Sequence, residues 1–294
     1  MSKIIPHLWF DTQAIEATRF YVTLFEDSRI DEMTVIKNTP SGDCDFVNFT
    51  LAGHAFSAIS AGPHFTLNPS ISLTAVFDDP QKLHDVFEKL SEKGKELMPL
   101  QAYPFCPLYG WIEDRYGLSW QLMLLNKGDI TQKIIYSFLF SKDHNGLSEK
   151  AARYYMEVFE NGKMNMIEYY QPNEAKAPHA KVKYLNFELA GHQFSAMDNA
   201  FDADYDFNEG FSFMVMCNDQ AEIDYYWEKL SHVEEAEQCG WCKDRFGVSW
   251  QIVPSNWDDV LFNGSEEERA RVTEAFLQMK KFDIAELMRA HKGV

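Results

Sequence analysis

Two kinds of hydrophobic pattern follow one another along this chain. Short apolar runs are typical of strands, and longer segments with apolar residues at helical spacing are typical of amphipathic helices. The helices carry end signals, as where Pro80 opens a helical segment and Gly94 closes it. The pattern predicts a strand over 4–10, a helix over 14–25, a hairpin over 46–60, a strand over 71–79, a helix over 80–94 and a hairpin over 110–125.

This order of elements occurs twice because the sequence itself repeats. The stretch FVNFTLAGHAFSA from Phe46 returns as YLNFELAGHQFSA from Tyr184, and GWIEDRYGLSWQ from Gly110 returns as GWCKDRFGVSWQ from Gly240. Each copy is too long to be one unit of a solenoid, so each is expected to be a complete domain. We expect a first domain over 1–125, a linker over 126–132, a second domain over 133–256 and a C-terminal helical tail over 257–294.

Charge and composition restrict the class of partner. The chain has 46% hydrophobic residues, enough for real cores, and a formal net charge of −18, which repels nucleic acid and anionic membranes. It has no apolar run long enough to span a bilayer, and its start does not resemble a signal peptide. The five cysteines are scattered, as reduced thiols are. We therefore expect a cytoplasmic protein whose partner is a small molecule, without nucleic acid or membrane binding.

The stretch Cys239-Gly-Trp-Cys242 has the spacing of a redox or zinc motif. Redox chemistry would need a cysteine at a helix N-terminus, but a turn and a strand are predicted here. A structural zinc site would need further ligands, and the other repeat has Tyr109 and Ile112 at these positions. The sequence thus favours two reduced thiols near a strand end.

Two aspartates recur in the same hairpins. Asp114 and Asp244 each open a tight turn before glycine, and turn chemistry explains them. Strand alternation predicts that Trp120 points away from Gln121, towards a helix.

Several stretches together resemble a known family: LWFD, GPHF, ISLTAVFDD, CGWCKDRFGVSWQIVP and the tail segment MKKFDIAELMRA. They are similar to the PhnB-like (3-demethylubiquinone-9 3-methyltransferase-like) proteins of the vicinal oxygen chelate, or glyoxalase/bleomycin-resistance, superfamily. The resemblance implies an α+β fold of tandem domains, each made of two βαβββ modules that form a curved, mixed, cup-shaped sheet. Four modules in one chain resemble a fused dimer, so we expect a monomer with pseudo-dimeric halves or a homodimer.

The resemblance also suggests where a ligand would bind. Metal-dependent members of the superfamily place His, Glu or Gln ligands on the cup face, and the glutamines after the repeated turns stand where such a member has Glu. A neutral amide cannot balance the charge of a divalent cation alone, so no cofactor is predicted, although a divalent metal stays possible at His7, Gln121 and Gln251. The candidate ligand-binding residues are His7, Trp9, His64, Trp111, Gln121, Trp241 and Gln251.

The resulting functional hypothesis is a small-molecule binding protein in which catalysis is unproven, as in bleomycin-resistance-type relatives. The alternative is a metal-dependent glyoxalase- or dioxygenase-type lyase or isomerase. In a third possibility one half is a degenerate scaffold, since His7 has Ser137 as its repeat partner. Methyl transfer is discounted because the sequence has no glycine-rich loop between a strand and a helix of a parallel sheet.

Overall fold

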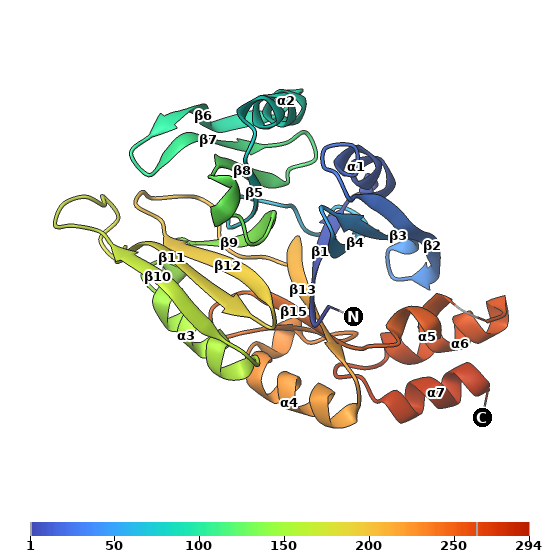
Figure 1. The fold of residues 1–294 in the computed structure, drawn as a ribbon. Coiled ribbons are helices and arrows are strands. Elements are labelled where there is room, and N and C mark those ends of the chain that lie inside the picture. The colour runs from blue at the N-terminus through green and yellow to red at the C-terminus, as the bar shows by residue number, and fades with distance from the viewer. Residues whose placement is uncertain (1, 263, 294) are drawn as a thin grey trace. The chain divides into compact units, whose positions relative to one another are not determined.

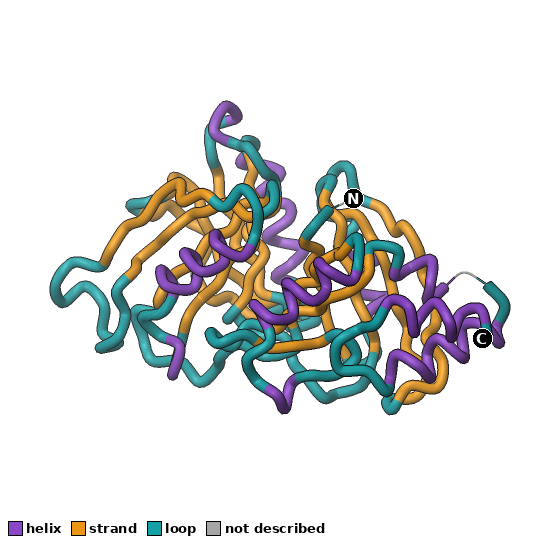
Figure 2. Tube along the Cα trace, turned by 90° about the horizontal axis from the view of Figure 1, so that it is seen from below, coloured by secondary structure: helices purple, strands orange, loops and turns teal. Residues whose placement is uncertain are grey.

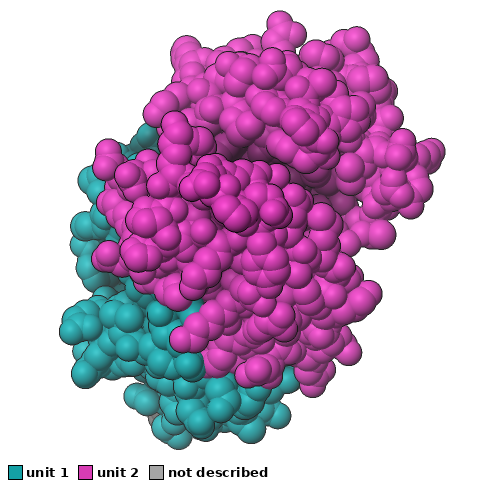
Figure 3. Space-filling view, turned by 90° about the vertical axis from the view of Figure 1, so that its left-hand side faces the viewer, with its two compact units in different colours: residues 1–66, 208–294 teal, residues 67–207 magenta. Residues whose placement is uncertain are grey.

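A computed structural model describes residues 2–262 and 264–293. Residues 1, 263 and 294, which belong to the expected first domain and tail, lie outside the described residues. Within the described ranges the chain is α+β, with two mixed sheets of seven and eight strands, as predicted (Figure 1). It divides into two compact units (Figure 3): unit 1 contains residues 1–66 and 208–294, and unit 2 contains residues 67–207.

The sheet of unit 1 has the order β14-β15-β13-β1-β4-β3-β2. Its central strands β1 and β13 are antiparallel, and each has a parallel neighbour on its other side. The strands are β1 (Ile4–Phe10), β2 (Arg29–Thr39), β3 (Gly42–Leu51), β4 (His54–Ser60), β13 (Phe211–Cys217), β14 (Trp241–Lys243) and β15 (Ser249–Pro254). The helices are α1 (Ala14–Tyr21), α4 (Gln220–Leu230), α5 (Trp257–Phe262), α6 (Glu266–Leu277) and α7 (Ile284–Lys292).

The sheet of unit 2 repeats this plan in the order β10-β11-β12-β9-β5-β8-β7-β6. Here β5 and β9 form the antiparallel centre. The strands are β5 (Ile71–Phe77), β6 (Lys95–Tyr103), β7 (Cys106–Glu113), β8 (Ser119–Leu124), β9 (Ile134–Phe140), β10 (Lys163–Tyr169), β11 (Val182–Leu189) and β12 (His192–Asp198). The helices are α2 (Pro80–Ser91) and α3 (Ser148–Val158).

Each sheet therefore joins one module from each sequence half. Unit 1 combines the first module of the first half with the second module of the second half, and unit 2 combines the other two. The sequence suggested that each half would close its own sheet. In the observed pairing too, the first strand of every module has an antiparallel partner from another module.

The helices pack on one face of each sheet and leave the other face free of them along the central strands. In unit 1, α1 packs on β3 and β4 while α4 packs on β13 and β15; in unit 2, α2 and α3 pack in the equivalent way. The tail helices α6 and α7 run side by side at the end of unit 1 (Figures 1 and 2). We call the face of each sheet opposite α1–α4 its inner face.

Alternation along the strands assigns side chains to the two faces. Trp120 and Trp250 are fully buried towards the helices, as predicted, so Gln121 and Gln251 point to the inner faces. None of the helices in the described part of the chain is long and apolar enough to cross a membrane.

Candidate functional site

A row of polar side chains crosses the inner face of unit 1. His7 on β1 lies directly opposite Ser57 of β4 on one side and Ser212 of β13 on the other. Ser212 in turn lies opposite Ser249 of β15. All four side chains are buried, so their hydrogen-bonding groups must find partners inside the protein or in a bound molecule.

The contacts of Ser57 favour one tautomer of His7. The Ser57 hydroxyl lies 3.1 Å from Met214 Sδ and can donate its single proton there. In the tautomer that agrees with this bond, His7 Nδ1 donates to Ser57 Oγ, 2.7 Å away. The other ring nitrogen, Nε2, then carries a lone pair. Burial lowers the pKa of His7 to about 3, so the ring is neutral at physiological pH.

Aromatic rings adjoin this row. The Trp241 ring meets His7 edge-on at 5.6 Å between centroids and Trp9 at 6.2 Å. Trp9 also contacts His64 and Phe65, and its indole donates to Gly62 O at 2.8 Å. The two tryptophans are half-buried, and they give the inner face of unit 1 an aromatic boundary beside the polar row.

Gln251, two residues after Ser249 on β15, extends the polar surface along the strand. Its Nε2 donates to Ser212 Oγ at 3.0 Å, and it lies opposite Trp241. The structure thus brings His7, Trp9, His64, Trp241 and Gln251 together in unit 1. These are five of the seven residues predicted from the sequence.

The other two, Trp111 and Gln121, lie on the inner face of unit 2. Tyr109 donates its hydroxyl proton to Gln121 Oε1 at 2.8 Å, and the Trp111 indole donates to Ser119 Oγ at 2.8 Å. The predicted residues therefore form two separate groups, one in each unit. Whether they bind a ligand stays a prediction.

Sequence reasoning missed several polar residues of these faces. Ser57 orients His7, and Tyr109 holds Gln121, yet neither was predicted to take part. For Ser57 the available signal was its recurrence as Ser195 within the repeated Phe-Ser-Ala. For Tyr109 the sequence offered no signal, because the other repeat has Cys239 at that position.

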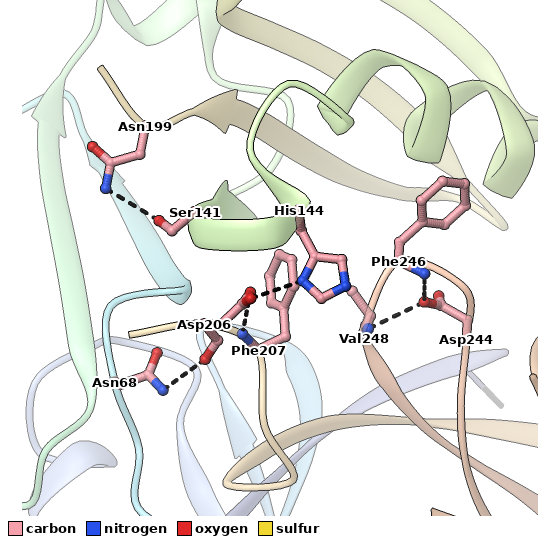
Figure 4. Close-up of polar contacts among 9 residues, drawn as sticks. All are labelled: Asn68, Ser141, His144, Asn199, Asp206, Phe207, Asp244, Phe246 and Val248. Carbon is pink, nitrogen blue, oxygen red and sulfur yellow. Dashed lines mark hydrogen bonds and ion pairs between the residues drawn. The ribbon is translucent and has the colours of Figure 1, made fainter. Parts of the chain in front are cut away.

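The repeated aspartates are structural, in agreement with the turn interpretation. Asp244 Oδ1 accepts from the backbone N–H groups of Phe246 and Val248 (Figure 4), and Oδ2 accepts from the Trp250 indole at 2.8 Å. Asp114 makes the same three contacts in unit 2. Each carboxylate therefore ties a turn to a core tryptophan.

The two cysteines of the CGWC stretch also have structural positions. Cys242 is buried on β14, and Cys239 stands in a left-handed backbone conformation with a φ of 52°. Burial raises the pKa of Cys239 to about 11 and that of Cys242 further above its usual range. Neither thiol is therefore ionised near pH 7, as a redox nucleophile would need to be.

A further polar cluster, in unit 2, was not predicted. His144 Nδ1 lies 2.8 Å from Asp206 Oδ2, and the Asn68 amide donates to Asp206 O at 3.0 Å (Figure 4). Nearby, Asn199 donates to Ser141 Oγ at 3.1 Å. These contacts fasten the loop after β12 to the segments that follow β9 and precede β5.

The donor set does not suit a divalent cation. Among the described residues, no group of three or more His, Cys, Asp or Glu side chains is placed to hold a metal ion. The weak candidates His7 and Gln251 lie in unit 1 beside serines, whereas Gln121 lies in unit 2. Neutral imidazole, amide and hydroxyl groups supply no charge to balance a 2+ ion.

Known proteins resemble this chain in sequence or in fold. A PhnB protein from Bacillus cereus is 38% identical over 42% of this chain and 99% of its own, with a TM-score of 0.40. Glyoxalase I from Zea mays is 10% identical over 86% of this chain and 94% of its own, with a TM-score of 0.54, and so shares the fold. A Bacillus subtilis protein whose name suggests a dioxygenase covers 98% of this chain and 94% of its own at 11% identity, with a TM-score of 0.52.

No curated protein matches the chain in sequence. The model of one family, described as 3-demethylubiquinone-9 3-methyltransferase, matches twice, over residues 2–123 and 132–253. These matches cover most of both sequence halves. The chain therefore belongs to this PhnB-like family and contains two tandem copies of its glyoxalase-fold domain.

Proposed function

We propose that this protein binds an uncharged small molecule on the inner face of a sheet. The observation that carries the proposal is the buried polar row of unit 1, in which neutral groups lie beside the rings of Trp9 and Trp241. Small-molecule sites commonly combine apolar and aromatic walls with a few placed polar groups. The fold alone would not support this conclusion, because glyoxalase-fold proteins have diverse functions.

Charge supports an uncharged ligand. Lys243 lies opposite Ser249 and forms a 2.7 Å ion pair with Glu209, so its charge is already balanced. His7 is neutral because its pKa is lowered, so it offers no positive charge to an anion. A carboxylate or phosphate would lose its hydration there without a compensating cation.

Methyl transfer is not part of the proposal, despite the family's name. Proteins that hold a nucleotide cofactor on a glycine-rich loop generally use a parallel sheet with crossover helices. Both sheets here are mixed and contain antiparallel hairpins such as β3–β4 and β7–β8.

Thermal unfolding of the full chain with a panel of uncharged aromatic and amphipathic molecules tests the proposal. A ligand at about 100 times its Kd should stabilise the fold by about 2.7 kcal/mol and raise the Tm. Matched carboxylated molecules serve as the control and should leave the Tm unchanged. No shift with any uncharged molecule would contradict the proposal.

Metal content must be measured in parallel on protein purified without chelator. A stoichiometric zinc, nickel, manganese or iron ion that raises the Tm would instead support the alternative, a metal-dependent lyase or isomerase. The lone pair at His7 Nε2 is the feature that would favour that outcome.

A further inference from the structure

The inner face of unit 2 can be compared with that of unit 1, because its polar side chains form hydrogen bonds with one another. Ser137, the repeat partner of His7, is 2.7 Å from both Thr74 Oγ1 and Ser195 Oγ. Ser119 is 2.9 Å from Ser72 Oγ and accepts the indole proton of Trp111. This network is buried and closed on itself, and it needs no bound molecule to complete it.

In unit 1, different residues at the equivalent positions remove hydrogen bonds of this network. Cys239 stands where unit 2 has Tyr109, so Gln251 has no phenol to bind and turns to Ser212. Ser212 Oγ accepts from Gln251, and Ser249 lacks the serine partner that Ser119 has in Ser72.

Two further differences lie beside this one. The Trp241 indole packs against the rings of His7 and Trp9, whereas the equivalent Trp111 donates to Ser119. Met214 of unit 1 stands at the position of Thr74. The Ser57 hydroxyl donates to Met214 Sδ, so Ser57 Oγ acts towards His7 as an acceptor.

As a result, two buried polar atoms of unit 1 lack a hydrogen-bond partner. Among the described residues, neither His7 Nε2 nor Ser249 Oγ has a hydrogen-bond partner. Both residues are at most 2% exposed, and both stand in the row that crosses the inner face. Stranding a buried polar group is costly, so two such atoms in one row indicate a missing partner.

We propose that unit 1, and not unit 2, is the ligand-binding unit, and that its ligand is a flat, uncharged molecule whose hydroxyl group pairs with His7 Nε2 and Ser249 Oγ. This inference rests on the proposed function and adds the unit and the chemical class. A hydroxyl donates its proton to the His7 lone pair and accepts the proton of Ser249. The rings of Trp9 and Trp241 are T-shaped to each other, so one can stack on the flat body of the ligand while the other meets its edge.

Three naphthalene probes test the chemical class. Binding of 2-naphthol, 2-methoxynaphthalene and 2-naphthoate to the full chain is measured by tryptophan quenching and calorimetry. We expect 2-naphthol to bind at least about tenfold more tightly than the methoxy compound, which cannot donate to His7, and we expect no binding of the anion.

Two matched serine variants test the unit. Ser249→Ala should weaken 2-naphthol binding about threefold to tenfold without lowering the Tm, because the hydroxyl is buried without a partner in the free protein and its removal costs no hydrogen bond. The equivalent change in unit 2, Ser119→Ala, should lower the Tm because it strands Ser72 and Trp111. It should leave the affinity unchanged.

A third variant transfers the unit 2 residue into unit 1. His7→Ser introduces serine, the residue that unit 2 has at the equivalent position 137, and removes the acceptor nitrogen Nε2. It should abolish the preference for 2-naphthol over the methoxy compound.

Several results would overturn the inference: equal affinity for the two neutral probes, tighter binding of 2-naphthoate, weaker binding in Ser119→Ala, unchanged binding in Ser249→Ala, or no saturable binding of 2-naphthol. If uncharged molecules from the wider panel still raise the Tm in any of these cases, the proposed function stands and only the unit or ligand class is wrong. If no uncharged molecule raises it, both fail.

Discussion

Asp114 and Asp244 recur in the sequence because each carboxylate holds one turn together. The side chain of Asp114 is buried, and it accepts two backbone N–H groups and the Trp120 indole. A buried donor that loses its acceptor costs about 1–3 kcal/mol. The energetic role of this aspartate is therefore larger than that of an ordinary turn residue.

Asp114→Ala should lower the free energy of unfolding by about 2–4 kcal/mol, since it strands three donors at once. Urea denaturation of the variant measures this loss. Asp129→Ala is the control, because Asp129 is exposed and its side chain accepts from the exposed Asn126 amide. It should change stability by less than about 0.5 kcal/mol. Equal effects of the two substitutions would refute the structural assignment of Asp114.

His7 makes stability depend on pH. Its folded-state pKa is about 3, below the value near 6.5 expected when unfolded, so the unfolded state binds a proton first as pH falls. The stability that neutral His7 contributes is complete above pH 6.5 and is lost as pH falls towards 3. Between pH 6 and 4.5 the wild type should lose about 2 kcal/mol more than His7→Ser does. Parallel unfolding curves across this range would show that His7 is not buried as a neutral ring.

For single residues, the sequence predicted the sheet face of a side chain better than its hydrogen-bond partner. Strand alternation placed Gln121 and Gln251 on the inner faces correctly. It could not show that one pairs with Tyr109 and the other with Ser212, because those partners come from other strands whose register depends on the tertiary fold.

Among the secondary-structure elements, the C-terminal tail covers the β14 edge of the unit 1 sheet. In unit 2 the equivalent strand β7 pairs with β6, but β14 is short and the tail lies there instead. Cys239 N and Gly240 N donate to the carbonyl groups of Met279 and Lys280, each at 2.8 Å. The tail therefore satisfies backbone groups that an edge strand would otherwise satisfy.

Gly240 packs closely against the tail. Gly240→Ala should lower the free energy of unfolding by about 2–4 kcal/mol, because its φ is +81° and a Cβ would lie 2.7 Å from the Phe282 ring. Gly191→Ala has a similar φ of +83° but open space around the new Cβ, so it should lose only about 1–2 kcal/mol. Thermal and urea unfolding of both variants isolates the tail contact. Equal losses would mean that the tail does not pack at Gly240.

The elements that were missed share one physical property. The predictions included the hairpin over 46–60 and the helix that begins at Pro80, and both are confirmed. They did not identify the sheet-edge strands β2, β6 and β10. These strands are largely exposed, so they lack the apolar alternation that marks a half-buried strand.

At the scale of the whole molecule, the repeat and the family resemblance revealed the fold but not how the modules pair. The first strands of the four modules, β1, β5, β9 and β13, are all short apolar runs. Hydrophobic pattern alone makes each an acceptable partner for any other. Pairing across the halves is a property of the folded chain, and local sequence does not encode it.

This pairing makes a strong prediction for a divided chain. If residues 1–125 and 133–294 are produced as separate polypeptides, each loses the antiparallel partner of its central strands, β13 and β9 for the first half and β1 and β5 for the second. Co-expressed halves should therefore form a one-to-one complex with the sedimentation behaviour of the intact chain. The intact chain itself should sediment as a monomer, because its four modules already pair with one another. A first half that folds alone as a stable monomer would show that modules within one half can pair equally well, and that the exchange between halves is not required for folding.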